Sequence, residues 1–260
     1  MKHRSIVHLA AAAGLLGLAW ACSESTSPST ASLVNQTTLT SDVASSSGDA
    51  IAADVQVIAT NEGFAGLAAS IDQAPATDSV SYTRTRTCYD STGTSTTCGT
   101  SAVRKAVMFV SFAWARHDTA ADGAVFLGAV KRVAYDTLFR NYTGATETSR
   151  THDGNSAGTD TVSFVGPNVT RTYDEAGTDS VDAVTYNLPR INNPWPISGK
   201  IVRNVSLHAT FTSATRSDTT DVTKRVEVDF PPDNQGNVVL KIDGKTCNLN
   251  LVTHHVSNCQ

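Results

Sequence analysis

Residues 201–211 read IVRNVSLHATF, and the alternation within this stretch decides the class of fold. The apolar residues are Ile201, Val205, Leu207, Ala209 and Phe211, and the polar residues Asn204, Ser206, His208 and Thr210 stand between them. Successive side chains of a β-strand point to opposite faces. A period of two therefore predicts a half-buried antiparallel strand here.

The residues that follow extend this pattern toward the C-terminus. Val226, Val228 and Phe230 alternate in the same way before two prolines end the strand. Asp243 and Gly244 predict a two-residue type I′ hairpin, because both central positions of that turn need a positive φ. The hairpin would pair residues 242 with 245, 240 with 247 and 238 with 249, and it would place residue 247 on the inner face.

The chain before residue 201 predicts a short helical region followed by more strands. Ile51, Val55 and Ile58 recur at helical spacing after Asp49, which would cap a helix that ends near Gly63, and a second short helix is expected at residues 64–71. Residues 103–115 are expected to form a strand buried on both faces, and residues 126–142 to be mostly strand.

Between residues 146 and 186 the glycines suggest short strands separated by turns. We expect strands at residues 146–151, 159–165, 169–173 and 180–186, and an acidic turn formed by Asp174, Glu175, Asp179 and Asp182. The predicted fold class is mainly β: an antiparallel meander sheet or an open barrel or sandwich, with one or two short N-terminal helices.

The N-terminus has the features of a signal peptide over residues 1–21. Lys2 and Arg4 precede an apolar run at residues 9–21, which is too short for a stable membrane span. Residues 18–22, LAWAC, resemble the bacterial lipobox, in which the cysteine, here Cys22, is acylated and becomes the new N-terminus. Simple secretion is the alternative, because Ala19 and Ala21 also fit an A-x-A cleavage site.

Residues 22–47 are expected to form a flexible linker that tethers the folded part to the lipid on Cys22. This stretch is rich in Ser and Thr and has few large apolar residues to offset its ordering entropy. Ser23, rather than an aspartate, follows the cysteine, which favours sorting to the outer membrane of the cell envelope. Residues 48–260 would form a single, mainly antiparallel β domain with short helices at its start.

Charge and cysteine content agree with export. The chain has 20 basic and 24 acidic residues. Loss of Lys2 and Arg4 with the signal leaves 18 basic against 24 acidic residues, a net charge of about −6, which argues against nucleic acid as a partner.

We expect the disulfides Cys88–Cys98 and Cys247–Cys259, because each pair brackets a predicted hairpin in an oxidising compartment. Zinc binding is the alternative, although none of these cysteines stands in a C-x-x-C motif.

Three stretches together carry a family resemblance: residues 193–203 (NPWPISGKIVR), 147–153 (ETSRTHD) and 237–251 (NVVLKIDGKTCNLNL). They resemble a group of uncharacterised bacterial lipoproteins with Thr-rich β-strands, a proline-flanked tryptophan before a strand and a final hairpin with N-G-K or D-G-K. The resemblance covers about residues 78 to 252. It implies a lipid anchor and a β-fold and carries over no catalytic residue.

Few residues are candidates for chemistry. We expect the histidines to be solvated surface residues, and adjacent residues on a strand point to opposite faces, so we predict no catalytic residue, no metal and no cofactor. The histidines concerned are His117, His152, His208, His254 and His255. Trp195, between two prolines, is the one candidate ligand contact, since its ring could stack on a sugar; alternatively it caps the open end of the core.

The sequence therefore leaves three functional interpretations. The predicted one is a non-catalytic exported envelope lipoprotein that is not an enzyme and has a structural or interaction role. The first alternative is a binding module for an apolar or glycan ligand that uses a concave sheet face or a barrel mouth. The second alternative is a metal-dependent hydrolase built on the histidines, which would require histidines and carboxylates to converge on one point.

The lipobox resemblance generates a direct prediction for Cys22. Mass spectrometry of the mature protein should show an acylated N-terminal cysteine, and Cys22→Ser should release the protein from membranes because the lipid is its attachment. An unmodified cysteine in the membrane-bound mature protein would contradict the anchor.

Overall fold

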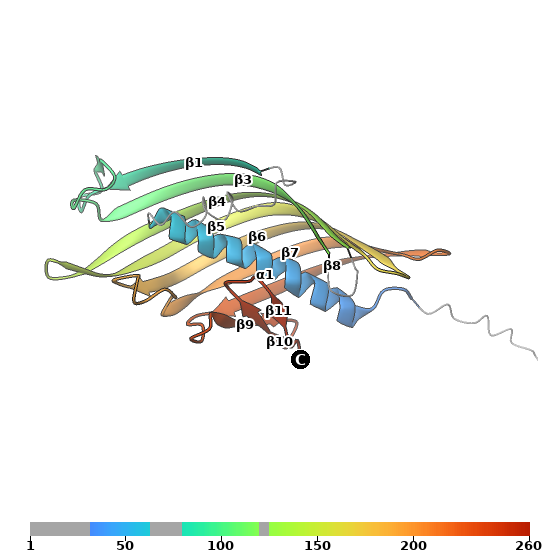
Figure 1. Cartoon of the computed structure of the whole chain (residues 1–260). Helices are drawn as coiled ribbons and strands as arrows, with labels where there is room; N and C mark the ends of the chain where they lie inside the picture. The colour runs from blue at the N-terminus through green and yellow to red at the C-terminus, as the bar shows by residue number, and fades with distance from the viewer. Residues whose placement is uncertain (1–31, 63–79, 120–124) are drawn as a thin grey trace, which may run out of the picture. The chain divides into compact units, whose positions relative to one another are not determined.

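The computed structural model describes residues 32–62, 80–119 and 125–260, which belong to one compact unit, Ser32–Gln260 (Figure 1). One helix, α1 (Gln36–Asn61), packs on a single antiparallel sheet in this part of the chain. The described strands are β1 (Val80–Tyr89), β2 (Ser95–Thr96), β3 (Lys105–Thr119), β4 (Val125–Thr143), β5 (Thr146–Val165), β6 (Thr170–Asn187), β7 (Ser198–Thr212), β8 (Ser217–Asp229), β9 (Asn237–Ile242), β10 (Lys245–Asn250) and β11 (Val256–Ser257). The mainly β fold class is confirmed, in its open meander form.

The sheet is a meander from β3 to β11, where each strand lies beside its neighbour in sequence, and at its other end β1 lies between β3 and β2. Its order is β11-β10-β9-β8-β7-β6-β5-β4-β3-β1-β2, and all pairs are antiparallel. The half-buried strand expected at residues 201–211 is β7, and the region 126–142 is indeed strand, as β4. No helix of the described residues is long and apolar enough to span a membrane.

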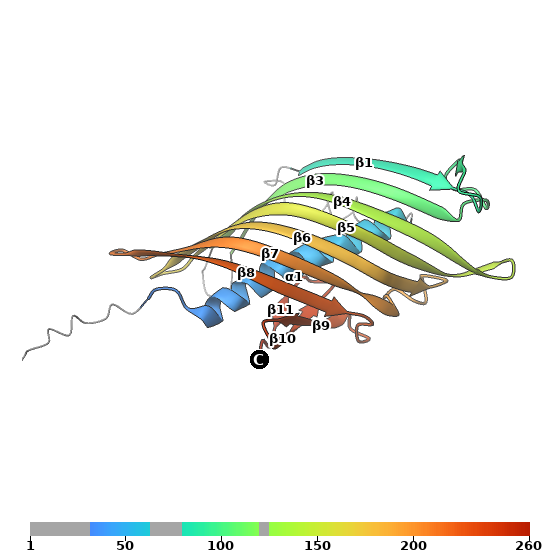
Figure 2. The same cartoon turned by 180° about the vertical axis from the view of Figure 1, so that it is seen from behind.

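The two faces of the sheet have different surroundings. We call the face that carries Arg132, Ser156 and Arg203 the helix face, because α1 lies against it, and the face that carries Lys131, Thr159 and Ser206 the open face. Figure 2 shows the open face with α1 behind the strands. The expectation that residues 103–115 are buried on both faces is wrong: Met108 and Val110 are buried on the helix face, but Phe109 and Ser111 are partly exposed on the open face.

The expected short strands at residues 146–186 are two long strands, β5 with 20 residues and β6 with 18. Glycines that suggested turns lie inside them. A Cβ on Gly177 would lie 2.5 Å from Cζ of Arg203, and a Cβ on Gly158 would lie 2.7 Å from Cγ of Arg132. These glycines therefore make room for large buried side chains on neighbouring strands rather than ending the strands.

The helix begins earlier than expected. Asn35 caps it by accepting hydrogen bonds from the backbone N–H groups of Thr37 (2.9 Å) and Thr38 (3.1 Å), so Asp49 is an interior residue and not the cap. The expectation of a flexible linker at residues 22–47 is consequently wrong for its last twelve residues, which are helical and bury Leu39 and Val43 against the sheet. The expected signal peptide, Cys22 and the helix expected at residues 64–71 lie outside the described residues.

The C-terminal hairpin confirms its expected register. Asp243 and Gly244 have φ of 51° and 75°, and residues 242, 240 and 238 pair with 245, 247 and 249. Cys247 is buried on the inner face. This hairpin and β11 lie close to α1, since a Cβ on Gly48 would come within 3.1 Å of Leu249 in β10 and 2.7 Å of Val256 in β11. The helix is thus held between the long strands and the C-terminal segment.

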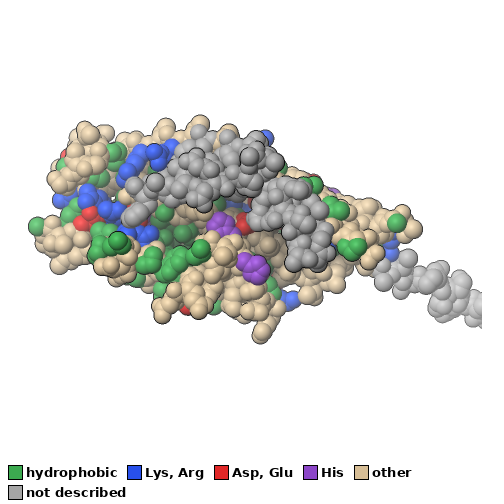
Figure 3. Space-filling model, viewed as in Figure 1, with side chains coloured by type: hydrophobic (Ala, Val, Ile, Leu, Met, Phe, Trp, Pro, Cys, Tyr) green, Lys and Arg blue, Asp and Glu red, His purple; other side chains and the backbone are tan. Residues whose placement is uncertain are grey.

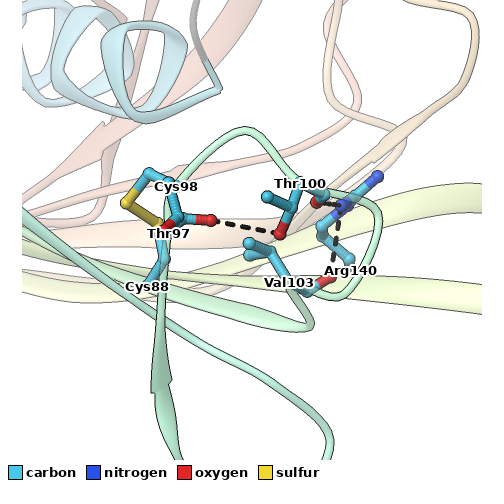
Figure 4. The surroundings of a disulfide bond; sticks show 6 residues. All are labelled: Cys88, Thr97, Cys98, Thr100, Val103 and Arg140. Atoms are coloured by element: carbon cyan, nitrogen blue, oxygen red, sulfur yellow. Dashed lines mark hydrogen bonds between the residues drawn. A yellow bond between two sulfur atoms is a disulfide. The ribbon is translucent and has the colours of Figure 1, made fainter.

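Both expected disulfides are present, Cys88–Cys98 and Cys247–Cys259, with sequence separations of 10 and 12. Figure 4 shows the first one, at the base of the segment that joins β1 to β3. Arg140 of β4 donates to the carbonyl of Val103 at 3.1 Å, and the Thr100 hydroxyl donates to the carbonyl of Thr97, also at 3.1 Å. The segment is therefore held by hydrogen bonds as well as by the disulfide.

Because each disulfide closes a short loop, its loss should loosen one end of the sheet without unfolding the whole. We expect Cys88→Ala/Cys98→Ala and Cys247→Ala/Cys259→Ala each to lower the free energy of unfolding by about 2 to 3 kcal/mol. Amide hydrogen exchange should become faster near the altered loop only. Faster exchange throughout β4 to β7 in either variant would contradict this local role.

Candidate functional site

A network of buried ionic side chains connects α1 to the helix face of the sheet. We call this network the ionic core; its members are Ser46, Asp54, Arg132, Ser156, Asp160, Glu175, Asp179 and Arg203, and all are buried. Asp54 of α1 lies 3.8 Å from Arg132 of β4, and Ser46 of α1 donates a hydrogen bond of 2.8 Å to Glu175 of β6. The helix is attached to the sheet by charge and hydrogen bonding as well as by apolar contact.

Strand register brings the sheet members of the ionic core together. Ser156 of β5, Asp179 of β6 and Arg203 of β7 stand opposite one another in one row across the sheet. Arg203 donates to Asp179 at 3.2 Å and to Asp160 at 3.1 Å, and Arg132 also forms an ion pair with Asp179. Arg203 is fully buried on the helix face of β7, between the apolar residues Ile201 and Val205 of the same face. It occupies the one position of that face that does not follow the apolar pattern of residues 201–211.

Acidic groups outnumber basic ones in the ionic core, with four carboxyls against two guanidinium groups. Burial raises the pKa of Asp54 to about 7, against the attraction of Arg132, and burial likewise raises the pKa of Glu175 to about 7. One oxygen of each of these carboxyls, Asp54 Oδ2 and Glu175 Oε2, is buried without a hydrogen bond from the described residues. Neutral carboxyls therefore suit this site better than charged ones.

A second buried group joins the end of α1 to β4 and β5. His152 faces Asp136 through Nδ1 (2.9 Å to Oδ2) and Glu62 through Nε2 (3.4 Å to Oε1), and Asn61 donates to Asp136 at 2.6 Å. Burial opposes protonation of His152, yet the two carboxylates outweigh it and raise its pKa. Burial would raise the pKa of Glu62 as well, but His152 and Arg190 hold it below the ordinary value.

The expectation that His152 is a solvated surface residue is therefore wrong. Its side chain is 0% exposed because it lies under the last turn of α1, a contact between residues 90 apart that strand periodicity does not reveal. The acidic turn expected at residues 174–182 is also wrong, since this segment is the middle of β6 and buries Glu175 and Asp179. A signal for both was present: charged residues stand at the positions that an alternating pattern assigns to the core.

Residues 154–158 read GNSAG, which matches the G-x-S-x-G pattern of hydrolase nucleophiles. That pattern requires a sharp turn between a strand and a helix, whereas Ser156 lies in the middle of β5 and is buried. Its hydroxyl donates to Asp179 at 2.8 Å and accepts from Arg132 at 3.0 Å. In this surrounding Ser156 is a member of the ionic core rather than a nucleophile facing a cleft.

The other histidines are spread over separate places. His208 is on the open face and pairs with Asp221 at 2.7 Å, His254 is half-buried near Asp49 (3.7 Å), and His255 is exposed. The side chain of His117 lies outside the described residues. Within the described ranges, no group of three or more His, Cys, Asp and Glu side chains is arranged to hold a metal ion.

Trp195 is partly buried and packs on the large apolar cluster at one end of the sheet. A Cβ on Gly236 would lie 2.7 Å from the Trp195 ring, so the indole covers the loop before β9 at close range. This contact favours the interpretation in which Trp195 caps the core. A ligand contact by Trp195 stays a prediction.

A shallow trough crosses the open face at right angles to the strands. Its floor is one register row of mostly short side chains: Ser81, Ala113, Lys131, Thr159, Ala176, Ser206 and Thr223. Two hollows of about 840 and 540 Å³ form it, and they share Thr159, Ala176 and Ser206. Neighbouring strands lie about 4.8 Å apart, so seven strands give the trough a length of about 29 Å.

Longer side chains stand on both sides of the trough. Val133 of β4 and Asn204 of β7 line one side. On the other, Asp174, His208 and Asp221 follow one another on β6, β7 and β8, with His208 bonded to Asp221. The trough thus offers hydroxyl groups along its floor and amide, imidazole and carboxylate groups along its two sides.

Comparison with known proteins identifies no relative of this chain. No protein-family model matches it, no curated protein is similar to it, and no solved structure matches it. The resemblance to Thr-rich bacterial lipoproteins stays a prediction.

The raised pKa values predict that the fold loses stability as the pH rises. A carboxyl with a higher pKa in the folded than in the unfolded chain stabilises the fold below its unfolded pKa, and this contribution is lost as the pH passes through the folded value, about 7 for Asp54 and Glu175. The raised pKa of His152 acts in the same direction. Urea unfolding should show a loss on the order of 2 kcal/mol between about pH 5 and pH 9.

The double variant Asp54→Asn/Glu175→Gln should flatten this pH dependence, because amides of the same shape do not titrate. Asp221→Asn serves as the control, since it removes an exposed carboxyl outside the ionic core. An unchanged slope in the double variant, or a wild type that gains stability toward pH 9, would refute the assignment.

Proposed function

We propose that this chain is a non-catalytic, lipid-anchored protein of the bacterial cell envelope that acts as an interaction protein and binds an extended polar polymer, a glycan strand, along the trough. The trough is the observation that carries this proposal. It is open at the surface and runs across seven strands, so it suits a chain-like ligand better than a compact molecule.

The position of α1 on one face of the sheet supports the choice of the open face for the ligand. A ligand on the helix face would have to displace α1, because α1, the ionic core and the apolar cluster occupy that face. The open face is free of α1 and keeps its side chains exposed along β5 and β6. Because the helix fixes the strands from behind, the trough is supported by a packed structure.

The chemistry of the trough favours a polar ligand over an apolar one. Small-molecule pockets are concave and mostly lined by apolar side chains, whereas this surface is shallow and carries Lys131, Thr159, Ser206 and Thr223 in one row. Such groups exchange hydrogen bonds with sugar hydroxyls, each contributing modestly. Several weak contacts along a polymer then add up to useful affinity.

The proposed location rests on the N-terminal sequence. A lipid on Cys22 would hold the chain at a membrane, and Ser23 favours the outer membrane, where envelope glycans are within reach of a tethered domain. Residues 23–31 would remain as the linker between the lipid and the part of the chain that packs on the sheet, which includes Leu33. The net charge of about −6 after loss of the signal peptide agrees with a neutral or weakly charged partner.

The test blocks the trough with large side chains. Ala176→Trp and Ser206→Trp both alter exposed positions on its floor, so the fold should be kept while a ligand is excluded sterically. A glycan array with the wild type selects an oligosaccharide, and calorimetry should then show that each variant weakens its binding by about tenfold or more.

Thr219→Trp is the matched control, because it places the same side chain on the open face of β8 outside the trough. It should bind the oligosaccharide as the wild type does. The proposal fails if no glycan binds the wild type, or if the floor variants and the control bind equally well.

A further inference from the structure

Most of the outer edge of β1 has no described strand beside it, and no residue of the ionic core lies on β1. β1 pairs with β3 along its whole length, but β2 covers only Cys88 and Tyr89. Residues 80–87 therefore have no strand beside them in the described part of the chain, and Figures 1 and 2 show β1 at the rim of the sheet. An edge of this kind presents a row of backbone N–H and C=O groups that can pair with another strand.

The side chains of residues 83–87 along this edge are exposed on both faces. Thr83, Thr85 and Thr87 alternate with Arg84 and Arg86, and all five are exposed. The two arginines belong to the helix face, since their register partners on β3, Val110 and Met108, are buried there. The edge thus has a neutral hydroxyl row on one face and a positive row on the other.

The positive charge of this edge is not balanced by the described residues around it. Arg84 and Arg86 form no ion pair with a described carboxylate, and Asp136, which shares the register row of Arg86 and Met108, is bound by His152 and Asn61. Burial and the charges of Arg150, Arg84 and Arg140 lower the pKa of Arg86 and outweigh the attraction of Asp136, which agrees with a positive local potential. Figure 3 shows Lys and Arg atoms gathered over the region where Figure 1 draws β1.

We propose that residues 80–87 bind an extended acidic segment of a partner protein, which adds to the sheet as a further strand beside β1. Backbone hydrogen bonds would hold the segment, and carboxylates at alternate positions would lie opposite Arg84 and Arg86. Eight extended residues span about 27 Å, which sets the length of the segment. This interaction is separate from glycan binding in the trough, which crosses the edge only at Ser81.

A second copy of the chain fits this edge less well. Antiparallel pairing of β1 with itself would bring Arg84 and Arg86 of both copies to the same face of the join, where like charges repel. The edge of β8 before Val226 differs, because Asp218 there already accepts a hydrogen bond from the backbone N–H of Leu33 at 2.7 Å. Charge thus favours an acidic partner at β1.

The test uses the full mature protein and two fluorescent eight-residue peptides, one alternating Thr with Glu and one alternating Thr with Lys. The Glu peptide should bind in a polarisation assay and slow amide hydrogen exchange in residues 80–87. Arg84→Glu/Arg86→Glu should weaken its binding by about tenfold or more and allow the Lys peptide to bind. Arg84→Gln/Arg86→Gln should have an intermediate effect.

Arg225→Glu/Lys241→Glu is the control, because it changes the net charge equally at exposed positions of the open face outside the trough. It should leave the Glu peptide bound to the same edge. Equal binding of both peptides, protection outside residues 80–87, or a dimer whose interface maps to β1 would overturn the proposal. Binding of vesicles with anionic lipid that needs both arginines, without binding of the Glu peptide, would also overturn it. The glycan assay is independent of these outcomes.

Discussion

The buried contact between Asp54 of α1 and Arg132 of β4 is the interaction on which the other features depend. Both groups are out of water, and a buried contact between a carboxyl and a guanidinium group is tolerated only when further hydrogen bonds and opposite charges surround it. Ser156, Asp179 and Arg203 provide them from three more strands. Without α1, Arg132 and Glu175 of the sheet would lose their partners Asp54 and Ser46. The helix and the sheet therefore stabilise each other.

This dependence assigns different roles to the two faces. Polar and charged groups on the helix face bind α1 along its length. They contact Asp42 near the start of the helix, Ser46 and Asp54 in its middle, and Glu62 just after its end. His152 and Ser156 on this face form their hydrogen bonds within these contacts. The two proposed binding surfaces therefore lie elsewhere: the trough of short side chains on the open face, and the exposed rim strand β1.

An open sheet has to limit pairing at its edges. The rim strand β1 carries Arg84 and Arg86 on the helix face, and charges on an edge strand discourage indiscriminate pairing with other sheets. The same charges select among partners, because an acidic strand would neutralise them while a second copy would double them. Protection against aggregation and a preference for an acidic partner thus follow from the same two residues.

The sequence by itself determined the features that depend on neighbours along the chain: the strand at residues 201–211, the type I′ hairpin at Asp243 and Gly244, and both disulfides. Apolar alternation and turn residues involve only neighbouring positions in the sequence, so they can be recognised without knowledge of the fold. Only the tertiary structure decided that residues 36–47 are helical, that Gly158 and Gly177 lie inside strands, and that His152 and Arg203 are buried. Each of these depends on a partner far away in sequence, as Gly177 does on the guanidinium of Arg203 and His152 on Glu62. Burial of a polar group is favourable only when such a partner is in place, and local pattern does not reveal which partner that is.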